Sequence, residues 1–294
     1  MAAKISSLDI QLLRLATKRI VQLSYTLTPA TAPLRTISWL KERQPNHLPA
    51  LLTYDRFCQG QTTDRDPADA VASDPTHGHD LTAAVADLHQ LITQIVADRT
   101  PIGNVDAAQL VLVGNSIGCA LSRLYAHEYP GTVAALLLLD SNLANSDFVS
   151  IFPDPESPVS VETLRLGRGM MRKVFHPDVG NKEGLSRRNL PTLLPSSDSP
   201  KLQGVNGGGP YVTVIGHDYE AFAEESAKMG FPRAFLTQYV NPFWNEYNQG
   251  LVRITDAARG NGPLLAPGSG HFVQRDNPDF VVEELVNILG KVRI

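Results

Sequence analysis

The chain has 294 residues, of which 43% are hydrophobic, and its formal net charge is −4. This length can bury one large core, and the negative charge argues against nucleic acid as a partner. No apolar run approaches membrane-spanning length and no signal-peptide pattern opens the chain, so we expect no membrane partner. The two cysteines, Cys58 and Cys119, favour a reducing compartment such as the cytoplasm over a disulfide framework. No Cys/His spacing indicates a structural metal.

The first hundred residues predict a helix, three strands and a longer helix. Apolar side chains on one helical face predict the first helix over residues 7–20. Alternation predicts a strand over residues 20–28, and residues 34–40 are a second candidate, antiparallel to the first. A buried strand follows over residues 49–56. A helix from about Leu81 to Asp98 comes next, with Asp80 as its N-cap.

The most informative stretch is residues 109–140, which reads as strand, helix, strand. Two apolar runs of buried-strand length flank a segment in which leucines recur at helical spacing. Such a βαβ unit implies a parallel sheet. At its first strand-to-helix corner lies the sequence Gly114-Asn115-Ser116-Ile117-Gly118, a G-x-S-x-G motif in the context that the motif requires. We therefore expect a sharp turn that presents the Ser116 hydroxyl above the carboxyl edge of the sheet.

The rest of the chain continues the pattern after a long excursion. Composition shifts towards proline and polar residues over residues 141–206, which is long for an ordinary surface loop. A core strand is predicted over residues 211–215, and mainly helix over residues 219–258. A short last strand at residues 263–266 leads into Gly268-Ser269-Gly270-His271-Phe272, and a final helix is predicted over residues 278–291.

Three of these features resemble the α/β-hydrolase superfamily. They are the G-x-S-x-G corner, the strand that ends in Tyr54-Asp55-Arg56, and the glycine-rich turn with His271 after the last strand. The resemblance implies an α/β fold with a mostly parallel central sheet and flanking helices. It implies a single domain over residues 1–294, in which residues 141–206 form a helical lid after the sixth strand of the family.

The same resemblance implies a catalytic triad in the order serine, acid, histidine. Ser116 is the expected nucleophile and His271 the expected base, and the backbone N–H of Ile117 is an expected oxyanion donor. Two residues compete for the acid. Asp218 ends the strand after the excursion, which is the common family position, and we favour it. Asp140 ends the strand before the excursion, which some members use, and it stays the alternative.

The amino-terminal part departs from the family pattern. No glycine precedes Gly60, so the HG motif that often supplies the second oxyanion donor is missing. Only eight residues separate Leu40 from Pro49, whereas a parallel crossover needs about a dozen or more. We therefore expect the third strand of the family to be absent. The Leu51 strand would then pair directly with the Ser116 strand, or a gap filled by side chains would separate the two. Esterase activity is then expected to be weak or lost.

These observations predict a serine hydrolase that cleaves an ester, lactone or similar acyl bond of a small molecule through an acyl-serine. No metal or cofactor is expected. The alternative is a hydrolase-like protein that binds a small molecule without turning it over. The sequence carries no signal for the oligomeric state.

Overall fold

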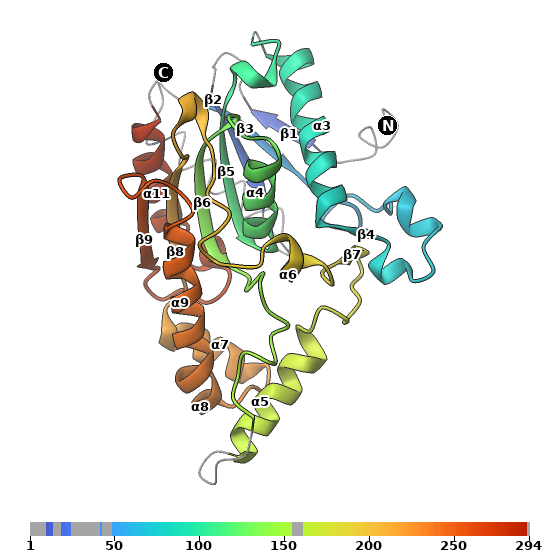
Figure 1. The fold of residues 1–294 in the computed structure, drawn as a ribbon, viewed down its shortest axis with the longest axis vertical. Coiled ribbons are helices and arrows are strands. Elements are labelled where there is room, and N and C mark those ends of the chain that lie inside the picture. Colours follow the sequence, from blue (N-terminus) through green and yellow to red (C-terminus); the bar gives the residue numbers. More distant parts are fainter. Residues whose placement is uncertain are drawn as a thin grey trace.

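The computed structural model describes residues 10–13, 19–24, 42, 49–100, 102–154 and 161–292. Within these ranges a seven-stranded sheet forms the centre of the molecule, and helices cover both of its faces (Figure 1). The strands in spatial order are β1 (Ile10–Leu13), β3 (Ala50–Tyr54), β2 (Arg19–Ser24), β5 (Gln109–Ser116), β6 (Val133–Ser141), β8 (Tyr211–Gly216) and β9 (Gly260–Leu265). All neighbouring pairs are parallel except β1 with β3. The fold class is therefore the predicted one.

Strand β2 occupies the central position that the sequence predicted to be empty. Val21 of β2 pairs in parallel register with Leu51 of β3 on one side and with Val111 of β5 on the other. The expected direct pairing of β3 with β5 is therefore wrong. The crossover argument failed because it placed the third strand too late in the chain. Since β2 ends at Ser24, residues 25–49 connect it to β3, which far exceeds the roughly dozen residues that a crossover needs.

Other amino-terminal predictions have mixed outcomes. The helix predicted over residues 7–20 is wrong where the chain is described, because Ile10–Leu13 form β1, antiparallel to β3. The strand predicted over residues 20–28 is confirmed for the part that lies in β2. Short apolar patterns fit a strand or a helix equally well, so periodicity alone could not separate them. The candidate strand at residues 34–40 lies outside the described residues.

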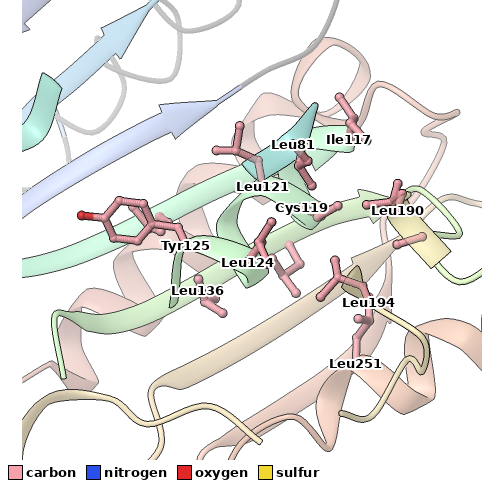
Figure 2. Close-up of a cluster of buried hydrophobic side chains, with 14 of the residues drawn as sticks. Leu81, Ile117, Cys119, Leu121, Leu124, Tyr125, Leu136, Leu190, Leu194 and Leu251 are labelled. Carbon is pink, nitrogen blue, oxygen red and sulfur yellow. The ribbon is translucent and has the colours of Figure 1, made fainter. Parts of the chain in front are cut away.

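Helices α3 (Leu81–Arg99) and α4 (Ile117–Glu128) pack together on one face of the sheet, and α11 (Pro278–Lys291) covers the other. Asp80 caps α3 as predicted, because its carboxylate accepts a hydrogen bond from the backbone N–H of Ala83. Figure 2 shows Leu121, Leu124 and Tyr125 of α4 gathered with other apolar side chains in the buried cluster under this helix. This packing fixes α4 against β5 and so fixes the corner between them.

The excursion between β6 and β8 contains α5 (Val161–Val174), β7 (Leu185–Ser186), α6 (Leu190–Leu193) and a 3-10 turn, η4 (Val205–Gly207). Helix α5 lies beyond the carboxyl ends of the central strands and packs against α8 (Arg233–Phe235) (Figure 1). Gly167 permits this approach, because a Cβ at that position would lie 2.3 Å from Cγ of Phe235. Phe152 also meets the Phe235 ring edge-on at 4.8 Å.

The middle of the excursion is held against the body of the molecule. Strand β7 pairs in parallel with β4 (His79–Asp80), directly before α3. The Glu183 carboxylate forms a buried ion pair with the Arg56 guanidinium, which follows β3, and one of its hydrogen bonds measures 3.0 Å. Short 3-10 turns lie between β3 and α3 and before β5: η1 (Pro67–Ala70), η2 (Pro75–His77) and η3 (Val105–Ala107).

Residues 219–258 are mainly helical, as predicted. They form α7 (Tyr219–Lys228), α8, a π-helical turn η5 (Leu236–Val240) and α9 (Asn241–Val252). After β9 come the short helix α10 (Val273–Asp276) and the predicted carboxy-terminal helix α11. Among the described helices, none combines the length and apolarity needed to cross a bilayer.

Candidate active site

The corner between β5 and α4 has the predicted strained geometry at Ser116. Its φ of 55° and ψ of −124° lie in a region that side-chain-bearing residues avoid, at a cost of about 1–3 kcal/mol. Gly114 makes the corner possible, since a Cβ there would lie 2.5 Å from both the carbonyl carbon and oxygen of Gly118. The Ser116 hydroxyl makes no capping bond to α4. The G-x-S-x-G sequence therefore forms the sharp strand-to-helix turn, or elbow, that the motif predicts.

The partner of His271 is Asp140, the alternative acid. Nδ1 of His271 lies 2.6 Å from Oδ2 of Asp140, within charge-assisted hydrogen-bonding distance. The Asp140 side chain is fully buried at the end of β6, and its φ of 41° is a second strained backbone conformation in the site. The bond engages Nδ1 of the imidazole, so Nε2 is the nitrogen left for a nucleophile.

Our preference for Asp218 as the acid is corrected by this geometry. Asp218 caps α7, because its Oδ1 accepts hydrogen bonds from the backbone N–H groups of Glu220 and Ala221 at 3.0 and 3.2 Å. Its Oδ2 accepts from the N–H of Gly268 at 3.2 Å. These bonds, that from Ala221 foremost, lower the pKa of Asp218. Its carboxylate thus supports the loop before His271 rather than the imidazole itself.

Asn115, the residue before Ser116, joins the elbow to both partner loops. Its buried Nδ2 donates to the carbonyl of Leu139, next to Asp140, and to the carbonyl of His271, each at 2.9 Å. Its Oδ1 accepts from Nε2 of Gln274 at 3.2 Å. One amide thereby connects the backbones beside all three residues. The sequence offered no sign of this role, because asparagine at a variable motif position carries no pattern of its own.

The end of β6 also contacts the elbow and α9. Ser141, which follows Asp140, is in register with Ser116, and the N–H of Asn142 donates to the Ser116 carbonyl at 3.3 Å. Nε1 of Trp244 in α9 donates to the Ser141 carbonyl at 2.7 Å. The Trp244 ring contacts the His271 ring edge-on, with 5.7 Å between the ring centroids. These contacts bring the carboxyl ends of β5 and β6 and the loop after β9 into one site.

A second histidine shares the Asp140 carboxylate. Nδ1 of His217 lies 2.8 Å from Oδ1 of Asp140, and the backbone N–H of His217 donates to the same oxygen at 3.2 Å. Burial on its own raises the pKa of Asp140, but the charges and hydrogen bonds of His217 and His271 outweigh it and lower the pKa to about 2. Asp140 is therefore ionised at neutral pH.

Ile117 is the first residue of α4, where backbone N–H groups have no partner within the helix. Its role as an oxyanion donor stays a prediction. The loop after β2, from which the family takes the second donor, lies outside the described residues.

The parallel sheet, the strained serine at its carboxyl edge and the Asp140–His271 pair define the class of α/β hydrolases. A sequence model of the alpha/beta hydrolase family matches residues 31–284, and the chain belongs to this family. Comparison with curated protein sequences gives no match.

Solved structures of similar fold include a thermophilic esterase from Thermogutta terrifontis, with a TM-score of 0.57 and 14% sequence identity over 98% of this chain and 94% of the esterase. A thermostable carboxyl esterase from Bacillus coagulans has a TM-score of 0.54 and 14% identity, over 97% of this chain and 94% of its own. Alpha/beta hydrolase domain-containing protein 10 from mouse has a TM-score of 0.53 and 14% identity, over 97% and 95%. At this identity the likeness establishes the shared fold.

Proposed function

We propose that this hydrolase cleaves an ester, lactone or similar acyl bond of a small molecule, with Ser116 as nucleophile, His271 as general base and Asp140 as the acid that orients it. The observation that carries the proposal is the 2.6 Å contact between His271 and Asp140 beside a strained elbow serine. The esterases among the proteins of similar fold support ester chemistry.

The reaction follows from the arrangement of the side chains. Oγ of Ser116 attacks the acyl carbon while Nε2 of His271 takes its proton, and Asp140 stabilises the resulting imidazolium. The tetrahedral oxyanion receives a hydrogen bond from the Ile117 N–H. His271 then returns the proton to the leaving group, and an acyl-serine remains. A water molecule then gives a proton to His271 and attacks the acyl-serine, and His271 passes this proton to Oγ of Ser116 as the carboxylic acid leaves.

The strained backbone also argues for catalysis over ligand binding alone. Both Ser116 and Asp140 have positive φ, and each such conformation costs about 1–3 kcal/mol. Two of the four non-glycine residues with positive φ in the described part of the chain are thus the proposed nucleophile and acid. The expected loss of activity rested on an absent third strand and on a missing HG motif. Strand β2 fills the place of that strand, whereas the loop after β2 lies outside the described residues.

The excursion over residues 141–206 serves in this proposal as the lid that selects the substrate. Within it the ring centroids of Phe148 and Phe175 lie 5.8 Å apart, and this apolar pair favours a fairly apolar acyl compound. The substrate is a small molecule, with neither nucleic acid nor membrane as partner. The free cysteines Cys58 and Cys119 suit a reducing compartment such as the cytoplasm.

A pre-steady-state assay with short-chain p-nitrophenyl esters tests the proposal. Wild-type protein should release a burst of p-nitrophenol, equal to the protein concentration where deacylation is slow, before steady turnover. The Ser116→Ala variant should show neither burst nor turnover. Equal hydrolysis by both proteins would overturn the proposal, and a failure of both to hydrolyse any ester would favour a binding protein.

A further inference from the structure

His217 occupies the end of β8, within the site but away from the reacting atoms. Its side chain is only 2% exposed. The ring stacks on Phe222 with 4.0 Å between the ring centroids. It contacts the Trp244 ring edge-on with 5.4 Å between the centroids. A buried histidine in such surroundings is ordinarily neutral, because burial disfavours charge. The hydrogen bonds around this ring require the opposite.

Both ring nitrogens of His217 face oxygen acceptors. Nδ1 lies 2.8 Å from Oδ1 of Asp140, and Nε2 lies 3.2 Å from Oδ1 of Asn241. The orientation of the Asn241 amide follows from its other end, where Nδ2 donates to the backbone carbonyl of Tyr219 at 3.2 Å. A carbonyl can only accept, so the amide oxygen must point to His217. A neutral imidazole has a single N–H. Its other nitrogen is a hydrogen-bond acceptor and would face an oxygen that is also an acceptor, which is repulsive.

The charges around His217 agree with this hydrogen bonding. Burial lowers its pKa, but the Asp140 carboxylate, the Asn241 hydrogen bond and the nearby Asp218 carboxylate outweigh it and raise the pKa above the ordinary value. From α7 the ring also meets Tyr219, whose pKa is raised by burial, so its phenol is neutral. Helix α9 contributes Asn241 and Trp244, which carry no charge. The remaining titratable neighbour is His271, on the far oxygen of Asp140.

We propose that His217 is a positioning residue: it stays an imidazolium and holds Oδ1 of Asp140, so that Oδ2 remains directed at His271. The inference rests on the proposed function and deepens it. Oδ1 accepts the Nδ1–H and backbone N–H of His217, and Oδ2 accepts the Nδ1–H of His271. Two donors on one oxygen fix the rotation of the carboxylate. The buried anion also has a buried cation beside it, which a neutral ring would not supply.

The protonation state can be measured without any activity. The full chain has eight histidines, and ring-¹⁵N labelling of them, with the His217→Gln variant to assign the signals, reports each nitrogen separately. At about pH 7.5 an ordinary histidine with a pKa of about 6.5 is about 90% neutral. Both ring nitrogens of His217 should instead show protonated signals at this pH. A protonated and an unprotonated nitrogen on His217 would overturn the proposal.

A second variant tests the same proposal in case His217→Gln does not fold. Asn241→Leu removes the acceptor at Nε2 and keeps the site apolar, so only the signals of His217 should move towards the neutral pattern. If the signals assigned to His217 stay unchanged in Asn241→Leu, the amide does not determine its protonation and the proposal fails.

The positioning role has its own readout in ester hydrolysis. His217→Gln should lower kcat about tenfold or more and leave KM within about twofold, because the lost contact orients His271 and does not touch the substrate. His127→Gln, at an exposed position near the end of α4, is the matched control and should keep both constants. An unchanged kcat in His217→Gln would overturn the role. If wild-type protein is inactive, the proposed function fails, while the labelling experiment still decides the charge of His217.

Discussion

Replacing Asp140 with asparagine should separate the two candidate acids. The Asp140 carboxylate is fully buried and accepts a hydrogen bond from Nδ1 of His271 at 2.6 Å. Its other oxygen lies 2.8 Å from Nδ1 of His217, whose proposed positive charge it neutralises. An asparagine of the same shape can turn its NH₂ group to His271, which then needs an unprotonated Nδ1. The proton moves to Nε2, and His271 can no longer accept the proton of Ser116.

The size of this effect follows from comparable triads. Loss of the acid with intact geometry lowers kcat about 10⁴-fold, which is about 5 kcal/mol of transition-state stabilisation. Folding should suffer as well. The substitution leaves the His217 imidazolium buried without its anion, and removing one partner of a buried pair costs about 3–5 kcal/mol.

Two measurements check this prediction. Initial rates with a p-nitrophenyl ester give kcat, and urea unfolding gives the stability of the same preparations. Asp218→Asn is the comparison variant. Asparagine caps a helix about as well as aspartate but loses the hydrogen bond from the Gly268 N–H, so kcat should fall far less than in Asp140→Asn. An inactive Asp218→Asn beside an active, folded Asp140→Asn would refute the assignment.

Three further predictions test the scaffold of the site. Asn115→Leu removes the amide donor of the His271 carbonyl and one donor of the Leu139 carbonyl, which keeps the contact from Cys119 Sγ at 3.5 Å. Urea unfolding should show a loss of about 1–3 kcal/mol or more and kcat should fall; an unchanged kcat would contradict the linking role. Glu183→Gln leaves the buried Arg56 guanidinium without its carboxylate, and urea unfolding should show a loss of about 3–5 kcal/mol; a wild-type midpoint would exclude this contribution. Gly114→Ala places a methyl group 2.5 Å from backbone atoms of Gly118, so thermal unfolding should show a loss of about 1–3 kcal/mol or more, with a large loss of activity; a fully active variant would refute the steric argument.

The sequence predicted well those parts of the fold in which local pattern and tertiary role agree. The apolar runs that became β5 and β6 are buried along their whole length, so their composition alone indicates central strands. The corner at Ser116 needed glycines for steric reasons that are visible in the motif itself. The cap of α3 at Asp80 is equally local.

The misplaced third strand and the preference for Asp218 both depended on long-range pairing. Residues 19–24 form the third strand because β3 and β5 flank them, and no feature within the segment distinguishes that place from an edge. The choice between Asp140 and Asp218 likewise depends on which strand end lies within hydrogen-bonding distance of the His271 imidazole. Both aspartates follow a core strand, and only the three-dimensional arrangement brings Oδ2 of Asp140 to His271 while Asp218 turns to cap α7.

The most direct test of the account is covalent labelling of Ser116. The purified chain is treated with a fluorophosphonate, which phosphonylates only a serine activated by a base, and tryptic peptides are analysed by mass spectrometry. We predict one phosphonate per chain, located on Ser116, with labelling abolished in Ser116→Ala and strongly slowed in Asp140→Asn. Wild-type protein that stays unlabelled, or that carries the label elsewhere, would contradict the assignment of Ser116 as the nucleophile.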